Sequence, residues 1–228
     1  MDLRTEEFER RLDDMGAEWT TWREVDVVAH YGDPDSEYQT IRAGGVGVCD
    51  FSARDTLVIS GTESVQWLQG LVTNDLHDLV EEGSGQQSTA VNDKGRLMAE
   101  MRILHLPEML VCDLEFGNLD DGFISHLRRQ VITEDVNIVD RSESTAKLGV
   151  FGRPAGELLD ELGEFEDSTG RLDVHDGTWG FIGEDDVVVQ RVDWIGIPGY
   201  LVSCDRRSLG GVWEQLMEGE AGLERAAI

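Results

Sequence analysis

The stretch NDKGRLMAEMRI, residues 92–103, decides how the middle of this chain folds. Its tripeptide Asp93-Lys94-Gly95 is typical of a tight turn, because glycine adopts the backbone conformations with positive φ that such turns need. The flanking segments 86–92 and 96–105 have the composition of β-strands. The sequence therefore predicts an antiparallel hairpin whose two strands are joined at this tripeptide.

Strands and helices alternate on both sides of the hairpin. Before it we expect a strand over residues 55–61 and a helix over residues 63–71 that Thr62 caps. After it we expect a strand, a helix and a strand over residues 109–114, 119–130 and 136–140. The order strand, helix, hairpin, strand, helix, strand is typical of an α+β fold with a largely antiparallel sheet.

Further elements are predicted towards both ends of the chain. Near the N-terminus, Thr5 caps an amphipathic helix, and the expected elements there lie at 5–15 (helix), 25–28 (extended), 35–43 (helix) and 46–51 (strand). In the C-terminal part they lie at 147–151 (strand), 155–162 (helix), 186–192 and 199–203 (strands) and 208–217 (helix). We expect two domains, residues 1–145 and 146–228, and an internal boundary at the acidic loop 163–172.

The charge of the chain excludes two classes of partner. It has 19 Lys and Arg residues against 47 Asp and Glu residues, a formal net charge of −28. Nucleic-acid binders need a basic surface, and an anionic membrane would repel this chain. The acidic residues are spread along the chain and lysine occurs only at Lys94 and Lys147, which indicates a protein adapted to high salt. An ordinary acidic cytosolic protein is the alternative.

The three cysteines do not indicate a disulfide framework or a zinc site. Cys49, Cys112 and Cys204 are far apart and form no C-x-x-C motif. Cys49 and Cys112 lie in apolar strand-like runs, which favours buried free thiols. The first residues contain no signal peptide, and no run reaches the roughly 18 to 20 apolar residues of a membrane span. We therefore expect a cytoplasmic protein without a metal site.

Six short motifs, in this order along the chain, resemble one known family. They are HYG (30–32), GVGVCDFS (45–52), GLVTNDL (70–76), NDKGRLMAEMRI (92–103), GRPA (152–155) and GIPGY (196–200). The chain is similar, over about residues 30–225, to the folate-binding superfamily of the glycine-cleavage T-protein and its YgfZ-type relatives. The turn sequence Asp93-Lys94-Gly95-Arg96 favours the YgfZ branch.

The resemblance implies a fold and a ligand. Members of the family surround a central channel with α+β domains and a C-terminal β-barrel, and the channel holds tetrahydrofolate. T-proteins transfer a one-carbon unit to that folate, whereas YgfZ-type proteins bind folate and assist iron–sulfur proteins. For this chain we expect antiparallel-sheet domains of that fold without the C-terminal barrel. We expect tetrahydrofolate or a related folate as the ligand and iron–sulfur proteins as clients.

The chain departs from the family patterns in three respects. T-proteins carry an Asp-Asp pair at the positions of Ala99 and Glu100. The first acid is therefore replaced by Ala99, whose side chain cannot donate or accept a proton at the folate. Alternation along a strand places Glu100 on the face opposite to Ala99. Ile197 stands where T-proteins have a glutamate that hydrogen-bonds to the folate ring. The YgfZ motif K-G-C-[YF]-x-G-Q-E does not occur before Ile228.

We select eight candidate folate-binding residues and no catalytic residue: Asn74, Asp93, Lys94, Arg96, Glu100, Asp113, Trp194 and Tyr200. Lys94 and Arg96 are candidate donors to the glutamate tail of a folate, or else turn residues in water. Asn74 is expected to hold its own turn, and Asp113 matches a channel asparagine of T-proteins. Trp194 and Tyr200 either stack on a pterin or belong to the core.

Three functions therefore stay open. The first is a folate-binding factor that supports iron–sulfur cluster assembly or repair, or one-carbon metabolism. The second is a folate-dependent aminomethyl- or methyltransferase that uses Glu100 or Asp93 as its acid. The third is a structural subunit.

Overall fold

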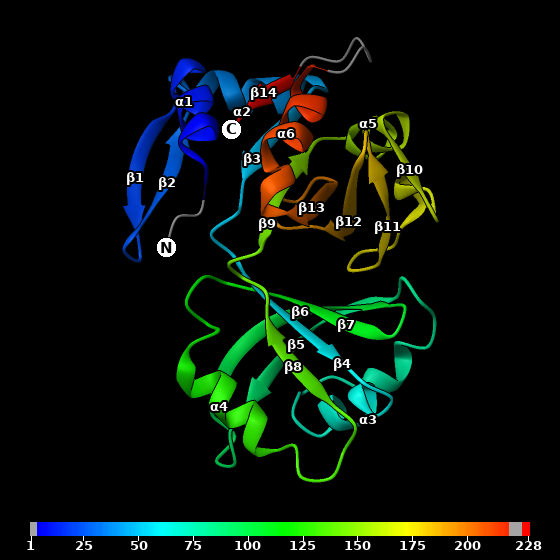
Figure 1. The fold of residues 1–228 in the computed structure, drawn as a ribbon. Helices are drawn as coiled ribbons and strands as arrows, with labels where there is room; N and C mark the ends of the chain where they lie inside the picture. The colour runs from blue at the N-terminus through cyan, green and yellow to red at the C-terminus, as the bar shows by residue number, and fades with distance from the viewer. Residues whose placement is uncertain (1–3, 219–224) are drawn as a thin grey trace. The chain divides into compact units, whose positions relative to one another are not determined.

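The structure, a computed structural model, describes residues 4–218 and 225–228. The chain forms two compact units, whose elements are labelled in Figure 1. Unit 1 is made of the described residues within Met1–Ala53, Glu143–Asp173 and Gly177–Ile228. Unit 2 consists of Arg54–Ser142 and Val174–Asp176. Each unit has its own sheet and its own apolar core.

The units divide the chain differently from the expected domains 1–145 and 146–228. Strand β3 (Val46–Asp50) hydrogen-bonds to β9 (Thr145–Phe151), so the N-terminal segment joins the C-terminal half of the chain in unit 1. The acidic segment 163–172 lies inside unit 1, where its first three residues pair with another strand. It is therefore not a boundary, because pairing between distant strands defines the units.

Unit 2 is built on a five-stranded antiparallel sheet of order β5-β6-β7-β4-β8. Its elements are β4 (Asp55–Ser60), α3 (Ser64–Gln69), the short 3-10 helix η1 (Leu76–Asp78), β5 (Gly85–Val91), β6 (Leu97–Leu106), β7 (Met109–Leu114), α4 (Asp121–Arg129) and β8 (Asn137–Asp140). The strands and helices expected between residues 55 and 140 are all present. The predicted hairpin is β5–β6.

One face of this sheet forms the core of unit 2. Alternate residues of the strands, such as Ile59, Ile103 and Leu110, are fully buried there against side chains of α3 and α4, among them Leu68 and Leu127. Because successive residues of a strand point to opposite faces, the residues between them lie on the second face of the sheet. That second face carries the candidates Glu100 and Asp113.

The start of α3 differs from the prediction. The capping position is Glu63, whose side chain makes no capping hydrogen bond, and the helix begins at Ser64. The hydroxyl of Thr62 donates instead to the Asp135 carboxylate at 2.8 Å, and the Thr62 N–H donates to the same carboxylate at 3.1 Å. Thr62 therefore does not cap the helix, because a carboxylate 73 residues away in the sequence binds its hydroxyl.

Unit 1 contains a seven-stranded sheet of order β10-β11-β12-β13-β9-β3-β14 and a separate hairpin β1–β2. The bounds not yet given are α1 (Glu6–Asp14), β1 (Glu18–Trp22), β2 (Val25–His30), α2 (Pro34–Ala43), α5 (Ala155–Leu162), β10 (Gly163–Phe165), η2 (Thr169–Arg171), β11 (Gly177–Ile182), β12 (Asp185–Val192), β13 (Gly199–Asp205), η3 (Arg206–Ser208), α6 (Leu209–Glu218) and β14 (Arg225–Ala227). Neighbouring strands are antiparallel except β14 and β3, which are parallel. Among the described residues, no helix of either unit is long and apolar enough to cross a membrane.

The two faces of the seven-stranded sheet hold different clusters. One face, with Val48, Leu148 and Val202, packs against helices α1, α5 and α6 and forms the main core of unit 1. The cap predicted for α1 is confirmed, since the Thr5 hydroxyl accepts a hydrogen bond from the Phe8 N–H. The other face holds a smaller cluster of Cys49, Phe151, Val192 and Leu201.

Four strands were not expected from the sequence: β1, β10, β11 and β14. The run GTWGFI of β11 contains two glycines, which are unfavourable in strand interiors. The structure explains one of them, because a Cβ at Gly180 would lie 1.9 Å from the backbone oxygen of Glu164 on β10. The close approach of these two backbones therefore requires glycine at this position.

Candidate functional site

The candidate site is a set of polar side chains on the second face of the five-stranded sheet of unit 2. We call this set the polar face and define it as Arg54, Gln87, Glu100, Arg102 and Asp113. Gln87, Glu100, Arg102 and Asp113 come from the three neighbouring strands β5, β6 and β7, and Arg54 precedes β4 directly. The strand register brings them together, since Gln87 is paired with Arg102 and Arg102 with Asp113.

Two arginines hold the Asp113 carboxylate. The Arg54 guanidinium donates to both of its oxygens, from Nε to Oδ1 at 2.9 Å and from Nη2 to Oδ2 at 2.8 Å. Arg102 Nη1 donates to Oδ2 at 3.3 Å. All three side chains are largely buried, so this is a network of charges removed from water rather than a surface ion pair.

The pKa values of the two arginines move in opposite directions. Burial alone would lower the pKa of Arg54, but the charges of Asp113 and Glu115 outweigh it and raise that pKa. Burial lowers the pKa of Arg102, and the Arg54 charge lowers it further, against the attraction of Asp113. A guanidinium stays protonated in proteins, so both remain donors with positive charge.

A second pair of the polar face is Gln87 and Glu100. Gln87 Nε2 donates to Glu100 Oε1 at 2.5 Å, and Glu100 is exposed. Thr89, the residue paired with Glu100 across the sheet, has its hydroxyl 2.8 Å from that of Thr73. Asn74 was expected to hold its own turn. Its Nδ2 also donates to the Gln87 backbone oxygen at 2.6 Å, which connects the loop around Asn74 to β5.

Ala99 points away from the polar face. It is 2% exposed and belongs to the apolar core of unit 2. The strand register shifts beside it, and Met98 also packs against the core. The expected alternation between positions 99 and 100 is thus observed, and a carboxylate on this sheet face comes from Glu100.

The turn of the β5–β6 hairpin carries Asp93, Lys94 and Arg96, all exposed. Asn92 organises this turn, since its Oδ1 accepts from the Lys94 N–H at 2.9 Å and from the Arg96 N–H at 3.1 Å. Gly95 has a φ of 70°, which explains the glycine of the predicted turn. Two basic side chains therefore lie at the end of the strand that carries Glu100.

Trp194 and Tyr200, the two candidates in unit 1, lie on different faces of its sheet. Tyr200 is 3% exposed and is part of the main core, where a Cβ at Gly156 would lie 2.5 Å from its hydroxyl. Trp194 packs with Phe51 and Phe151 against the smaller cluster, with ring centroids 5.3 and 6.1 Å away. We therefore leave Tyr200 out of the candidate site.

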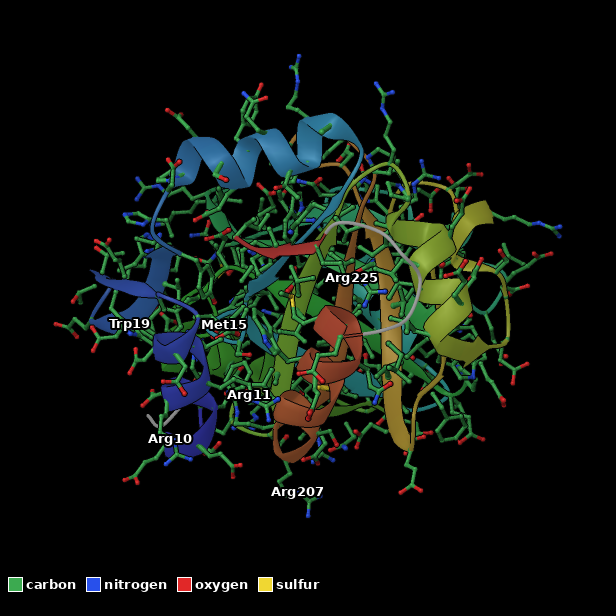
Figure 2. The ribbon with its side chains drawn as sticks, turned by 90° about the horizontal axis from the view of Figure 1, so that it is seen from above. Arg10, Arg11, Met15, Trp19, Arg207 and Arg225 are labelled. Atoms are coloured by element: carbon green, nitrogen blue, oxygen red, sulfur yellow. The ribbon has the colours of Figure 1, made fainter. Side chains whose placement is uncertain are left out.

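A cavity of about 280 Å³ in unit 1 is lined by three arginines, two of which form ion pairs with carboxylates. Figure 2 shows Arg11 on α1 and Arg207 next to the start of α6. Arg11 pairs with Glu214 at 3.3 Å and Arg207 with Asp205 at 2.9 Å. In the part of the chain that the structure describes, no three His, Cys, Asp or Glu side chains are grouped to hold a metal ion.

Sequence reasoning missed Arg54, Gln87 and Arg102. Arg54 and Gln87 lie outside the short motifs, whereas Arg102 lies inside the motif at 92–103 but was not selected. The Arg54–Asp113 and Gln87–Glu100 contacts join residues 59 and 13 positions apart. The one available signal was the period of two in the strand 96–105, which puts Glu100 and Arg102 on the same face.

Curated relatives are described as aminomethyltransferases. The aminomethyltransferase of Thermotoga petrophila is 24% identical over 215 residues, which cover 94% of this chain and 57% of that protein. A probable aminomethyltransferase of Haloarcula marismortui is 23% identical over 194 residues, which cover 82% of this chain and 52% of that protein. This chain thus spans just over half the length of these relatives.

Solved structures share the fold. The glycine cleavage system aminomethyltransferase T from Bartonella henselae matches with a TM-score of 0.80 at 16% identity, covering 98% of this chain and 59% of that one. A chain of the heterotetrameric sarcosine oxidase from Corynebacterium sp. U-96 matches with a TM-score of 0.58 at 12% identity, covering 85% and 95%. The expected α+β fold with antiparallel sheets is confirmed.

One family model accounts for both units. The model described as the GCVT N-terminal domain matches residues 8–227, almost the whole chain. The match includes the hairpin β5–β6, the polar face and the sheet of unit 1. The chain therefore belongs to the family of the GCVT N-terminal domain.

Proposed function

We propose that this chain binds tetrahydrofolate or a related folate through the polar face of unit 2. In this proposal the chain acts as YgfZ-type proteins do and supports iron–sulfur cluster assembly or repair, or one-carbon metabolism. Iron–sulfur proteins are then its clients. The observation that carries the proposal is the grouping of Glu100, Gln87 and two buried arginines on one sheet face. Membership in the GCVT N-terminal domain family supports it.

The donor and acceptor groups of the polar face fit a folate. The ligand has a ring rich in N–H donors and a tail with carboxylates. Glu100 and the Gln87 amide oxygen supply acceptors, and Arg102 supplies charged donors held in place by Asp113. A bound folate carries one-carbon units, while these side chains bind and orient it.

The hairpin turn supplies a second point of attachment in this proposal. Lys94 and Arg96 are exposed and are two of only 19 basic residues in a chain of net charge −28. They would donate charge-assisted hydrogen bonds to the carboxylates of a glutamate tail. Asp93 and Asn74 would keep the turn and the adjacent loop in place.

Calorimetry tests the proposal directly. The full chain is titrated with 5-formyltetrahydrofolate in buffer with molar KCl, and the expected result is saturable binding with one site per chain. The variant Lys94→Glu with Arg96→Glu should bind several-fold more weakly, because like charges then face the tail. The matched control Arg10→Glu with Arg23→Glu makes the same charge change in unit 1. Absence of folate binding by the unmodified chain would refute the proposal.

An aminomethyl- or methyltransferase is the second candidate. Two observations favour it: the relatives above are described as aminomethyltransferases, and the Glu100 carboxylate is exposed on the polar face. Such an enzyme would use Glu100 or Asp93 to manage a proton at the folate. Unchanged transfer activity in Glu100→Gln and Asp93→Asn variants would argue against that role.

A further inference from the structure

Two acceptor atoms of the polar face have no hydrogen-bond partner among the described residues. The Gln87 amide donates to Glu100 Oε1, so Glu100 Oε2 and Gln87 Oε1 remain, one on each side of that hydrogen bond. The orientation of the Gln87 amide follows from chemistry, because an ionised carboxylate only accepts hydrogen bonds. The pair therefore offers two neighbouring acceptors, one of which carries negative charge.

This arrangement selects the chemistry of a ligand. Two adjacent acceptors fit a ligand edge with two N–H donors, and the negative charge of Glu100 disfavours a carboxylate or phosphate at the same place. In a folate, the edge with two adjacent N–H donors is the aminopyrimidinone side of the pteridine ring. The glutamate tail instead carries carboxylates, which accept hydrogen bonds and are negatively charged.

The acceptor pair and the basic side chains of the hairpin turn lie at different places along β6. At about 3.3 Å per residue, the start of β6 at Leu97 lies roughly 10 Å from Glu100, and Arg96 and Lys94 lie beyond that end of the strand, in the turn. The acceptor pair is thus at one end of this path and the basic turn at the other, while the nearby charge of Arg102 is paired with Asp113. A long ligand with a donor edge at one end and carboxylates at the other matches this polarity in only one direction.

We propose that Glu100, positioned by Gln87, binds the aminopyrimidinone edge of the pteridine ring and so sets the direction in which a folate lies on unit 2. This inference rests on the proposed folate-binding function and adds a specificity-determining residue to it. Gln87 acts through Glu100, since its amide holds one carboxylate oxygen and leaves the other for the ligand.

The test uses three ligands that separate the two ends of a folate. The full chain is titrated with 5-formyltetrahydrofolate, with 6-methyltetrahydropterin, which has no tail, and with p-aminobenzoylglutamate, which has no ring. Glu100→Gln keeps the size of the side chain and removes its charge. We expect it to lower the affinity for the first two ligands by about tenfold to a hundredfold, the effect of one charge-assisted hydrogen bond. The affinity for p-aminobenzoylglutamate should not fall.

A control variant and a measurement of folding accompany this test. Glu108→Gln makes the same chemical change at an exposed turn residue and should leave all three affinities unchanged. Thermal unfolding of both variants verifies that they fold. If Glu100→Gln binds both pterin ligands as well as the unmodified chain, or loses affinity only for p-aminobenzoylglutamate, this inference is wrong while folate binding stands. If the unmodified chain binds none of the ligands, both proposals are wrong.

Discussion

Replacing Asp113 by asparagine should destabilise unit 2 strongly. The substitution keeps the shape of the side chain but removes the charge that three N–H groups of Arg54 and Arg102 contact. In the native chain the exposed fractions are 5% for Asp113, 11% for Arg54 and 13% for Arg102. The variant therefore leaves two positive charges near one another in a largely buried place.

The magnitude follows from the burial of this network. Removing one partner of a buried ion pair costs about 3 to 5 kcal/mol of unfolding free energy. Arg54 keeps a second carboxylate, since its Nη1 donates to Glu115 at 2.8 Å. We therefore expect the lower end, about 3 kcal/mol, which corresponds to a fall of roughly 6 to 12 °C in the melting temperature of a chain this long.

The assay measures stability globally and locally. Chemical denaturation and calorimetry in molar KCl give the global change, and hydrogen exchange of peptides from β6 and β7 reports on unit 2 itself. High salt should change the result little, because screening acts weakly on buried charges. The matched control Asp93→Asn, on the exposed turn, should stay within about 0.5 kcal/mol of the unmodified chain. A loss below about 1 kcal/mol for Asp113→Asn would refute the view that this carboxylate neutralises both arginines.

Two further predictions concern unit 1 and the thiols. Gly180→Ala should destabilise the chain by about 1 to 3 kcal/mol in denaturant titrations, because its Cβ would overlap the backbone of Glu164; an unchanged midpoint would contradict the close approach of β10 and β11. The three cysteines are free and buried, and burial raises the pKa of Cys204 to about 12 and that of Cys49 further. The native protein should therefore react slowly with iodoacetamide at pH 8, whereas the denatured chain should be labelled at all three thiols, as measured by mass spectrometry. Rapid labelling of Cys204 in the native state would contradict this prediction.

Much of the fold was predictable because its signals are local. The turn around Gly95, the cap at Thr5 and the apolar periods of the helices act over a few residues, so their elements lie close to the expected ranges. The prediction of Thr62 as a cap was wrong for the opposite reason, since Asp135 binds its hydroxyl from a distant part of the chain. The predicted burial of Cys49 and Cys112 in apolar strands is confirmed.

The candidate site was predictable only in part. Motif resemblance pointed to Glu100 and Asp113, which the structure places on one face of the sheet of unit 2. Of their partners, Arg54 and Gln87 lie outside the motifs, and Arg102 lies in the hairpin motif without a role that the motif assigns to it. Each becomes a partner only when β5, β6, β7 and β4 are paired in register, because a shift of one residue would move its side chain to the other face.

The sequence by itself determined the α+β class, the hairpin at residues 92–96 and the positions of most strands and helices. These properties follow from residue preferences and spacing over a few positions, which act before distant segments meet. Only the tertiary structure decided that β3 pairs with β9 and β14, so that the two ends of the chain form one unit. It also decided that Ala99 is core while Glu100 is exposed beside Gln87, because strand pairing and the register shift next to Ala99 set the face on which each side chain lies.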